Sequence, residues 1–367
     1  MGRDYNGFNT VYQPGNRVRS RGCVFTVETD AGVTGEFVGG TSTSYSQVQM
    51  VASYLLGRNP LERELIHNDI KRGMRHLDRQ GMGPINIALW DIAGKLYDAP
   101  IYEMLGGFRK TLPAYASTYH GDGNGGLDTP EAFAEFAVQC REMGYPALKI
   151  HGWGNGPIQR EVANVLAVRK AVGPGTDLMI DPACEYGTFA DALKVGRACD
   201  EASFFWYEDP FKDASISQFA HRKLRQLIET PLLIGEHVRT LEPHVDLVVA
   251  DATDFVRADA YLDCGITGLM KIAHAAEGFG LDVEIHGGGP AHRHCMAAIR
   301  NTNYYELGLV HPKLQRTKPP IYRDGFSDEL DAVDANGRVP VPQGPGLGVE
   351  IDRDWVKRHQ VDVAVYE

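Results

Sequence analysis

Apolar and polar positions follow two different patterns along the chain, and the change lies near residue 112. Apolar residues first alternate with polar ones over residues 23–29 and 33–38, with the turn Asp30-Ala31-Gly32 between them. This pattern predicts a β-hairpin. Apolar residues at helical spacing then predict three helices, over residues 44–56, 61–79 and 84–96. A hairpin followed by helices indicates a small α+β domain.

From residue 112 on, short apolar runs alternate with helical patterns, which is typical of βαβ units in a parallel sheet. The expected strands cover residues 112–117, 147–151, 178–181, 204–208, 232–236, 255–259, 283–286 and 304–307. A helical pattern follows each of the first six or seven. Eight parallel strands predict a closed α/β barrel. Beyond the Gly- and Pro-rich residues 340–348, we expect a short strand at 349–351 that pairs back with the first domain.

The composition narrows the class of protein. Hydrophobic residues make up 43% and charged residues 23% of the 367, which is typical of a globular chain. With 48 acidic residues against 37 Lys and Arg, the net charge of −11 argues against a nucleic-acid or membrane partner. The six cysteines are widely spaced with no Cys-x-x-Cys pair, so neither a zinc knuckle nor a disulfide framework is expected. No long apolar run or signal sequence stands out, and we expect a soluble, cytoplasmic protein.

Ionisable residues recur where the expected barrel strands end. They are Lys149, His151, Asp181, Glu208, Glu236, Asp259, His286 and Glu306. The carboxyl ends of barrel strands open into one mouth, so residues far apart in sequence should converge there.

Three of these residues, Asp181, Glu208 and Glu236, are carboxylates on consecutive strands. They would repel one another in a partly buried mouth unless a cation lay between them. Ligands that are all oxygens favour Mg²⁺. The sequence therefore predicts a magnesium site.

The next two strands end in Asp259 and His286, which form a second candidate group. A carboxylate that accepts from Nδ1–H holds an imidazole in one tautomer and leaves Nε2 free to move protons. Lys149 and His151 lie on one side of their strand, where Lys149 can neutralise a substrate carboxylate and His151 can carry a second proton. Glu306 is a candidate hydrogen-bond partner for a bound acid.

With these residues the chain resembles the enolase superfamily, and within it the mandelate racemase subgroup, which includes sugar-acid dehydratases. The resemblance covers nearly the whole chain. It rests on the segment from Gly83-Pro84-Ile85 through Asp91 to Lys95, on Leu105-Gly106-Gly107, on Tyr207-Glu208-Asp209-Pro210 and Gly235-Glu236, on Asp259 before Cys264-Gly265-Ile266-Thr267-Gly268, and on His286.

The resemblance implies a modified TIM barrel, (β/α)₇β, under an α+β capping domain built from both ends of the chain. The expected capping domain is residues 1–111, completed by about 340–367, and the barrel is residues 112–339. By resemblance, Asp181, Glu208 and Glu236 bind Mg²⁺, Asp259 and His286 form the acid–base pair, and Lys149 and Glu306 contact the substrate carboxylate. Assembly into a homo-oligomer is also expected from the family.

The chain departs from the family pattern at three places. His151 stands where the family usually has a second Lys, and it either replaces that base or binds a substrate hydroxyl. Asp181-Pro182-Ala183 lacks the usual Asn. The opening strand of the family is missing, which leaves residues 5–18 as the candidate lid over the site.

Removal of a proton α to a carboxylate requires the enediolate to be stabilised as it forms. Enolase-type sites do this with a Lys or His base and Mg²⁺. Loss of a β-hydroxyl then gives a 2-keto acid, and this dehydration of an aldonate or aldarate is the leading hypothesis. A racemase, epimerase or cycloisomerase that uses His151 and His286 is the alternative, and a barrel without catalytic activity is the third possibility.

Overall fold

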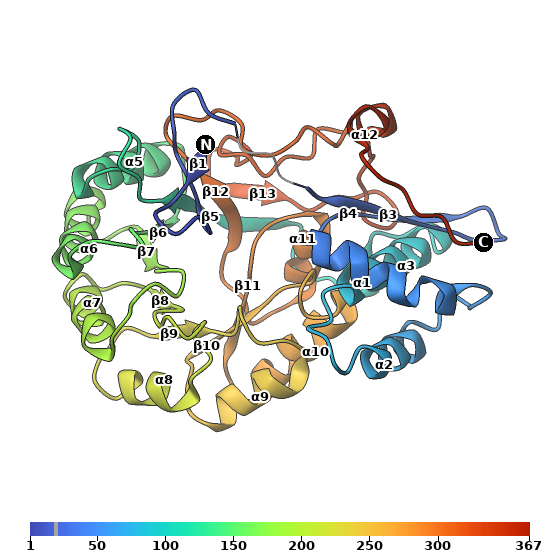
Figure 1. The fold of residues 1–367 in the computed structure, drawn as a ribbon, viewed down its shortest axis with the longest axis horizontal. Coiled ribbons are helices and arrows are strands. Elements are labelled where there is room, and N and C mark those ends of the chain that lie inside the picture. The colour runs from blue at the N-terminus through green and yellow to red at the C-terminus, as the bar shows by residue number, and fades with distance from the viewer. Residues whose placement is uncertain (18–20) are drawn as a thin grey trace.

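Eight parallel strands form a ring in the computed structural model, which describes residues 1–17 and 21–367 (Figure 1). Neighbouring strands pair in the order β12-β5-β6-β7-β8-β9-β10-β11. The ring closes beside β11, where the Val283 N–H donates to the Asn301 carbonyl. The strands are β5 (Thr111–His120), β6 (Ala147–His151), β7 (Asp177–Ile180), β8 (Trp206–Glu208), β9 (Leu232–Ile234), β10 (Phe255–Ala258), β11 (Asp282–Ile285) and β12 (Tyr305–Val310).

One helix follows each of the first seven barrel strands, which confirms the predicted α/β barrel (Figure 1). These helices are α5 (Pro130–Glu142), α6 (Ile158–Val172), α7 (Phe189–Glu201), α8 (Gln218–Arg225), α9 (Leu241–Val249), α10 (Gly265–Gly278) and α11 (Pro290–Ala298). Local sequence sets their starts: Thr129 caps α5 with Pro130 in its first turn, and Thr188 caps α7.

The barrel interior is apolar at its floor, where the strands begin. Tyr115, Ala147, Met179, Trp206 and Leu233 form one buried cluster there. Side chains on one face of a strand recur every second residue. The residue two positions after each floor residue therefore also points inward, one layer closer to the mouth.

The cap contains the hairpin and the helices predicted before residue 112. Its elements are β3 (Cys23–Glu28), β4 (Thr34–Gly39), α1 (Ser42–Leu55), α2 (Arg63–Gly73), α3 (Met82–Leu96) and α4 (Ile101–Met104). The helix predicted over 61–79 is shorter at both ends. Gly35 lies against α3 so closely that a Cβ there would be 2.1 Å from the Ala88 carbonyl oxygen. The absence of a side chain at Gly35 therefore allows β4 to pack closely on α3.

The cap and barrel meet where α3 packs on α10. The Asn86 side chain donates to Thr267 Oγ1 at 2.9 Å and accepts from the Thr267 N–H at 3.0 Å. Asn86 and Thr267 belong to the two glycine-containing motifs noted in the sequence. These motifs therefore join the two parts of the fold.

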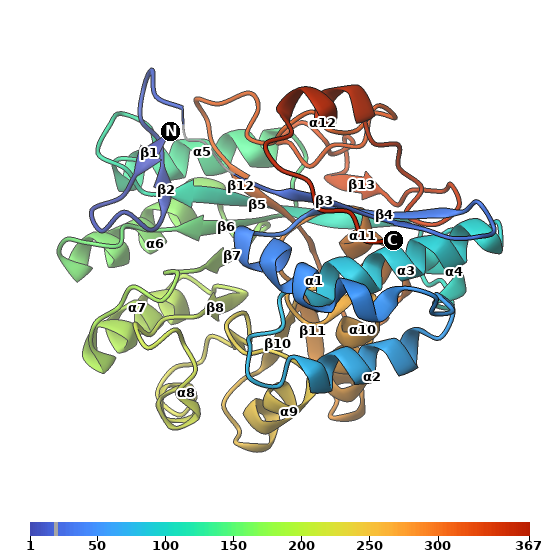
Figure 2. The ribbon, with the colours of Figure 1, turned by 45° about the vertical axis from the view of Figure 1, so that its right-hand side comes forward.

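The predicted strand at 349–351 is wrong. Ile351 makes a single antiparallel bridge with Tyr322, outside the first domain. The tail reaches the cap at other points: Gly346 bridges Pro100, the Leu347 N–H donates to Asp91 at 2.8 Å, and Arg353 of α12 (Arg353–His359) pairs with Glu36. Figure 2 shows α12 beside the cap hairpin. The Asp91 side chain holds the tail at this point. A contact through one side chain cannot be predicted from a strand pattern in the sequence. The added strand β13 (Arg338–Pro340) pairs antiparallel with the start of β5.

The N-terminus contains strands that the sequence did not predict. β1 (Gly2–Arg3) and β2 (Thr10–Val11) form a small antiparallel pair, and Val11 joins the end of β5 at His120. Two-residue strands are too short to show an alternating pattern. Across the described residues, no helix is long and apolar enough to cross a membrane.

Candidate metal and proton-transfer site

The three predicted metal ligands converge at the mouth. Asp181 follows β7, Glu208 ends β8 and Glu236 lies two residues beyond β9. One carboxylate oxygen from each lies within 4.8 Å of the others. Asp181 and Glu208 are buried and Glu236 is half-buried.

Lys149 lies beside Asp181 and Glu208 of this triad and is buried, with 1% of its side chain exposed. Its Nζ is 2.8 Å from Glu208 Oε2, 3.4 Å from Asp181 Oδ2 and 3.1 Å from Glu306 Oε1. Burial opposes the charge, yet Glu208 and Glu306 hold the pKa of Lys149 well above its usual value. The ammonium is therefore a fixed positive charge between two predicted site carboxylates and Glu306.

Arg257 in β10 is a site residue that sequence reasoning missed. Its side chain is fully buried, with Nε 2.8 Å from Glu208 Oε1 and Nη2 2.7 Å from Glu306 Oε2. Burial favours the neutral acid, but Lys149 and Arg257 hold the pKa of Glu306 well below its usual value. The sequence does carry a signal for Arg257, because it is a charged residue inside an otherwise apolar strand. A buried charge requires partners of opposite charge.

Asp259 and His286 are in contact, and each directly follows its strand, β10 or β11. His286 Nδ1 lies 2.7 Å from Asp259 Oδ2, and Nε2 lies 3.4 Å from Glu236 Oε1. Burial alone would lower the pKa of His286, but the charges of Glu236 and Asp259 raise it to about 9. The imidazole therefore links the Asp259 carboxylate to Glu236 of the triad.

The Asp259 carboxylate also contacts Tyr261 and His292, in addition to His286. Its Oδ1 accepts from the Tyr261 N–H at 2.5 Å and lies 3.0 Å from Nε2 of His292, a residue missed from the sequence. Burial is unfavourable to the carboxylate, but His292 and His286 keep its pKa well below the usual range. Asp259 therefore stays an anion that orients the His286 ring.

His151 lies at the opposite side of the triad from the Asp259 pair along the strand order. Its Nε2 is 3.1 Å from Asp181 Oδ2, and its Nδ1 is 2.7 Å from the Thr118 carbonyl. Only an Nδ1–H can bond that carbonyl, so Nε2 faces the mouth. His120 packs beside it, with ring centroids 4.9 Å apart.

The carboxylates at the mouth outnumber the permanent cations. Among the described residues, Lys149 and Arg257 are the permanent cations that pair with these acids, whereas six carboxylates gather at the mouth: Asp181, Glu208, Asp209, Glu236, Asp259 and Glu306. An excess of buried negative charge is unfavourable without a counter-ion. The oxygen-only triad at this spacing fits Mg²⁺.

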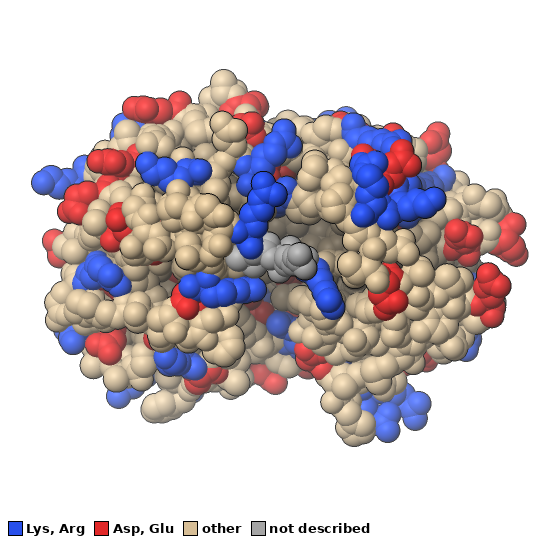
Figure 3. Space-filling model, turned by 45° about the horizontal axis from the view of Figure 1, so that its top comes forward, with Lys and Arg blue, Asp and Glu red and all other residues tan. Residues whose placement is uncertain are grey.

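The N-terminal segment rests on the loops around the mouth. The Tyr5 hydroxyl donates to Glu185 Oε2 at 2.9 Å, and Asn9 Nδ2 donates to Glu185 Oε1 at 3.2 Å. Tyr12 stacks on His311 with ring centroids 4.6 Å apart. Of the lid candidate at 5–18, residue 18 lies outside the described residues. Figure 3 shows lysine and arginine side chains gathered around a hollow on one face of the molecule.

Two family models match the chain. The model described as "Mandelate racemase / muconate lactonizing enzyme, N-terminal domain" matches residues 15–106, and "Enolase C-terminal domain-like" matches residues 132–355. The chain therefore belongs to the enolase superfamily, in its mandelate racemase and muconate lactonizing enzyme branch.

Similar proteins include several named as acting on sugar acids. A D-galactarolactone cycloisomerase of Agrobacterium fabrum is 30% identical over 89% of this chain and 88% of its own. A D-gluconate dehydratase of Thermoproteus tenax is 28% identical over 86% of this chain, which spans only 64% of that protein. The crystal structure of D-glucarate dehydratase from Agrobacterium tumefaciens complexed with magnesium superposes with a TM-score of 0.85, 29% identity, and coverage of 98% and 95% of the two chains.

Proposed function

We propose that this protein is a Mg²⁺-dependent hydro-lyase that dehydrates an acid sugar, an aldonate or aldarate, to a 2-keto-3-deoxy acid. The observation that carries the proposal is the position of His286, paired with Asp259 at one ring nitrogen and facing the carboxylate triad with the other. That ring nitrogen can reach a substrate bound at the triad.

Asp181, Glu208 and Glu236 would hold Mg²⁺, which when bound stabilises the negative charge of the enediolate. Lys149 supplies a permanent positive charge beside the substrate carboxylate. Glu306, kept ionised, holds Lys149 and Arg257 in place and offers its oxygens to substrate hydroxyls. The ion pairs described above hold these groups in place, so little reorganisation is needed as charge develops.

His286 carries the protons in this proposal. Its Nε2 donates a proton to the departing β-hydroxyl, and the Asp259 carboxylate stabilises the ring while it is charged. The negative charge of Asp259 beside Nδ1 favours the protonated imidazole, which can then act as an acid through Nε2. The α-proton is removed either by neutral His286, which then passes that proton to the departing hydroxyl, or by His151 from its place beside Asp181.

The test is a screen of acid sugars with Mg²⁺, read out as 2-keto acid. Wild-type protein should form a keto acid from at least one member of the library, and His286→Asn should not. A broad library without any product would contradict dehydration.

An epimerase or cycloisomerase is the second candidate, because His151 gives the triad a second imidazole. A similar protein, 30% identical, is named as a cycloisomerase. Solvent deuterium at the α-carbon of unreacted or inverted acid would favour this alternative. If His151→Ala loses deuterium exchange but still forms keto acid, His151 acts on one face of the substrate α-carbon and is not needed for dehydration.

The net charge of −11 and the gathered basic side chains support a small anionic substrate, with no role for nucleic acid or a membrane. All six cysteines are free, which supports a reducing, cytoplasmic location. We also expect a homo-oligomer, which sedimentation would measure.

A further inference from the structure

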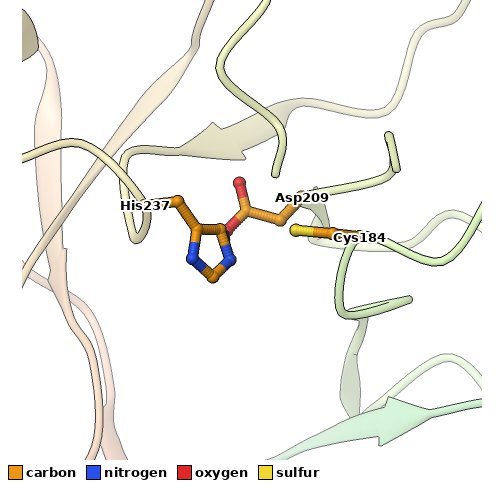
Figure 4. Close-up of side chains that lie close together, drawn as sticks. All are labelled: Cys184, Asp209 and His237. Atoms are coloured by element: carbon orange, nitrogen blue, oxygen red, sulfur yellow. Dashed lines mark ion pairs between the residues drawn. The ribbon is translucent and has the colours of Figure 1, made fainter. Parts of the chain in front are cut away.

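Beside the carboxylate triad lies a second group of side chains with mixed chemistry. Cys184, Asp209 and His237 each offer one sulfur, oxygen or nitrogen atom, and these atoms all lie within 4.8 Å of one another. Figure 4 shows the three side chains turned toward one another. This group, the Cys–Asp–His cluster, is distinct from the triad in residues and in ligand type.

Asp209 is the reason to expect a ligand in this cluster. Only 1% of the residue is exposed, and neither carboxylate oxygen finds a hydrogen-bond donor among the described residues. Among the described residues, the basic side chain paired with it is the His237 imidazole, with Nε2 3.5 Å from Oδ2. A buried carboxylate normally has hydrogen bonds or a cation, so these oxygens lack a partner that the cluster is shaped to hold.

The cluster is built by the same loops that build the triad. Asp209 and His237 directly follow Glu208 and Glu236, and Cys184 lies three residues after Asp181. The Cys184 N–H donates to the Asp209 carbonyl at 2.9 Å, and the Tyr186 N–H donates to Pro210 at 3.2 Å. These backbone bonds fix the loop after β7 against the loop after β8, so the thiol and carboxylate are held together.

The ligand types point to a cation softer than Mg²⁺. Thiolate, imidazole and carboxylate together are ligands of Zn²⁺ and related transition metals, whereas Mg²⁺ prefers oxygens alone. Donors around a tetrahedral Zn²⁺ lie roughly 3.5 Å apart, given bonds of about 2.0–2.3 Å. His237 Nε2 and Asp209 Oδ2 are 3.5 Å apart, all three atoms lie within 4.8 Å of one another, and the exposed His237 side chain can move to shorten the longer separations.

We propose that Cys184, Asp209 and His237 bind a second divalent cation of the zinc class, next to the predicted magnesium site. Three protein ligands leave one position open to water or to a ligand from solution. Binding displaces the proton of the Cys184 thiol to solvent, since the thiolate is the ligand. This proposal does not depend on the dehydratase activity.

Co²⁺ is the probe, because a cobalt–thiolate bond gives a charge-transfer band in the near ultraviolet. Full-length protein saturated with Mg²⁺ is titrated with Co²⁺ and followed by absorption and by equilibrium dialysis. We expect the thiolate band, at one Co²⁺ per chain, and its loss when Zn²⁺ is added. Co²⁺ that displaces Mg²⁺ from the all-oxygen triad gives no such band, so the two sites are distinguished.

Variants assign the band to the cluster. Cys184→Ser should abolish it, and His237→Asn should weaken Co²⁺ binding at least tenfold. Cys23→Ser, a half-buried cysteine outside the cluster, is the matched control and should keep the band. His237 is exposed, so His237→Asn remains informative if Cys184→Ser does not fold. Absence of the band in wild-type protein, or its persistence in folded Cys184→Ser, would overturn the proposal.

Discussion

The floor and the mouth of the barrel are built by the same strands and have opposite chemistry. On β6, β7, β8 and β10, the floor residues are Ala147, Met179, Trp206 and Phe255, and two positions later come Lys149, Asp181, Glu208 and Arg257. The strand period of two places both sets inside the ring. One layer is packed with apolar side chains, and the next is a network of charges.

This difference separates stability from function within single strands. Apolar packing at the floor closes the ring and excludes water from below. Excluding water strengthens each charge interaction above, because the effective dielectric falls. A substitution at the mouth should therefore lower activity, whereas a substitution at the floor should lower stability.

The largest effect is expected at the mouth, for His286→Asn. Asn can still donate a hydrogen bond to Asp259 but cannot transfer a proton, so keto-acid formation should fall by roughly 10²–10⁴-fold. The melting temperature should change little, since the side chain is partly exposed. Steady-state kinetics on a substrate found in the screen, alongside thermal unfolding, measures both. Turnover within threefold of wild type would contradict the assignment.

The matching change at the floor is Met179→Ala, at a residue with no exposed surface. The cavity left in a packed layer should lower the free energy of unfolding by about 2–5 kcal/mol. Mg²⁺ affinity should be retained, because the triad lies one layer above. Urea unfolding and calorimetric titration give the two values. Loss of Mg²⁺ binding at unchanged stability would show that the layers are not separable in this way.

The layered pattern explains what the sequence could predict. Strand ends such as Asp181, Glu208 and His286 stood out because each follows an apolar run, and the barrel brings the ends together. Arg257 and Asp209 were missed. Arg257 lies inside its strand rather than at the end, and Asp209 belongs to a motif whose chemistry was assigned to Glu208.

The tail and the N-terminus were hardest to predict, for a different physical reason. Their positions depend on single side chains, such as Asp91 with Leu347 and Tyr5 with Glu185. Such contacts leave no periodic pattern. The predicted division at residue 111 likewise remains a prediction, because the cap and the barrel share the long β5 region and the returning tail.

Metal binding should stabilise the mouth. At a Mg²⁺ concentration of about one hundred times its Kd, the free energy of unfolding should rise by about 2.7 kcal/mol. Glu236→Gln should remove most of this gain, because it deletes one of the three charges proposed to hold the cation. Urea unfolding with Mg²⁺ and with EDTA measures this gain in the free energy of unfolding for both proteins. An equal gain in the variant would place the ion elsewhere.

The smallest effect concerns Glu284, a carboxylate among the interior side chains of β11. Burial raises its pKa from 4.5 to about 7, although Asn303 donates to it at 2.6 Å. The folded state then binds more protons than the unfolded state between these values, so the free energy of unfolding falls as pH rises from about 4.5 to about 7. The fall should be about 1–3 kcal/mol.

Glu284→Gln keeps the acceptor for Asn303 and removes the titration, so stability should vary less across this pH window. Glu161 has a pKa raised to about 7 by burial elsewhere in the barrel, beside Trp153. Glu161→Gln is therefore a matched control whose effect should add to that of Glu284→Gln, because distant sites act independently. Unfolding in urea at several pH values checks both. An unchanged slope in Glu284→Gln would mean that Glu284 is ionised in the folded state, with its charge offset by Arg257 of the neighbouring strand.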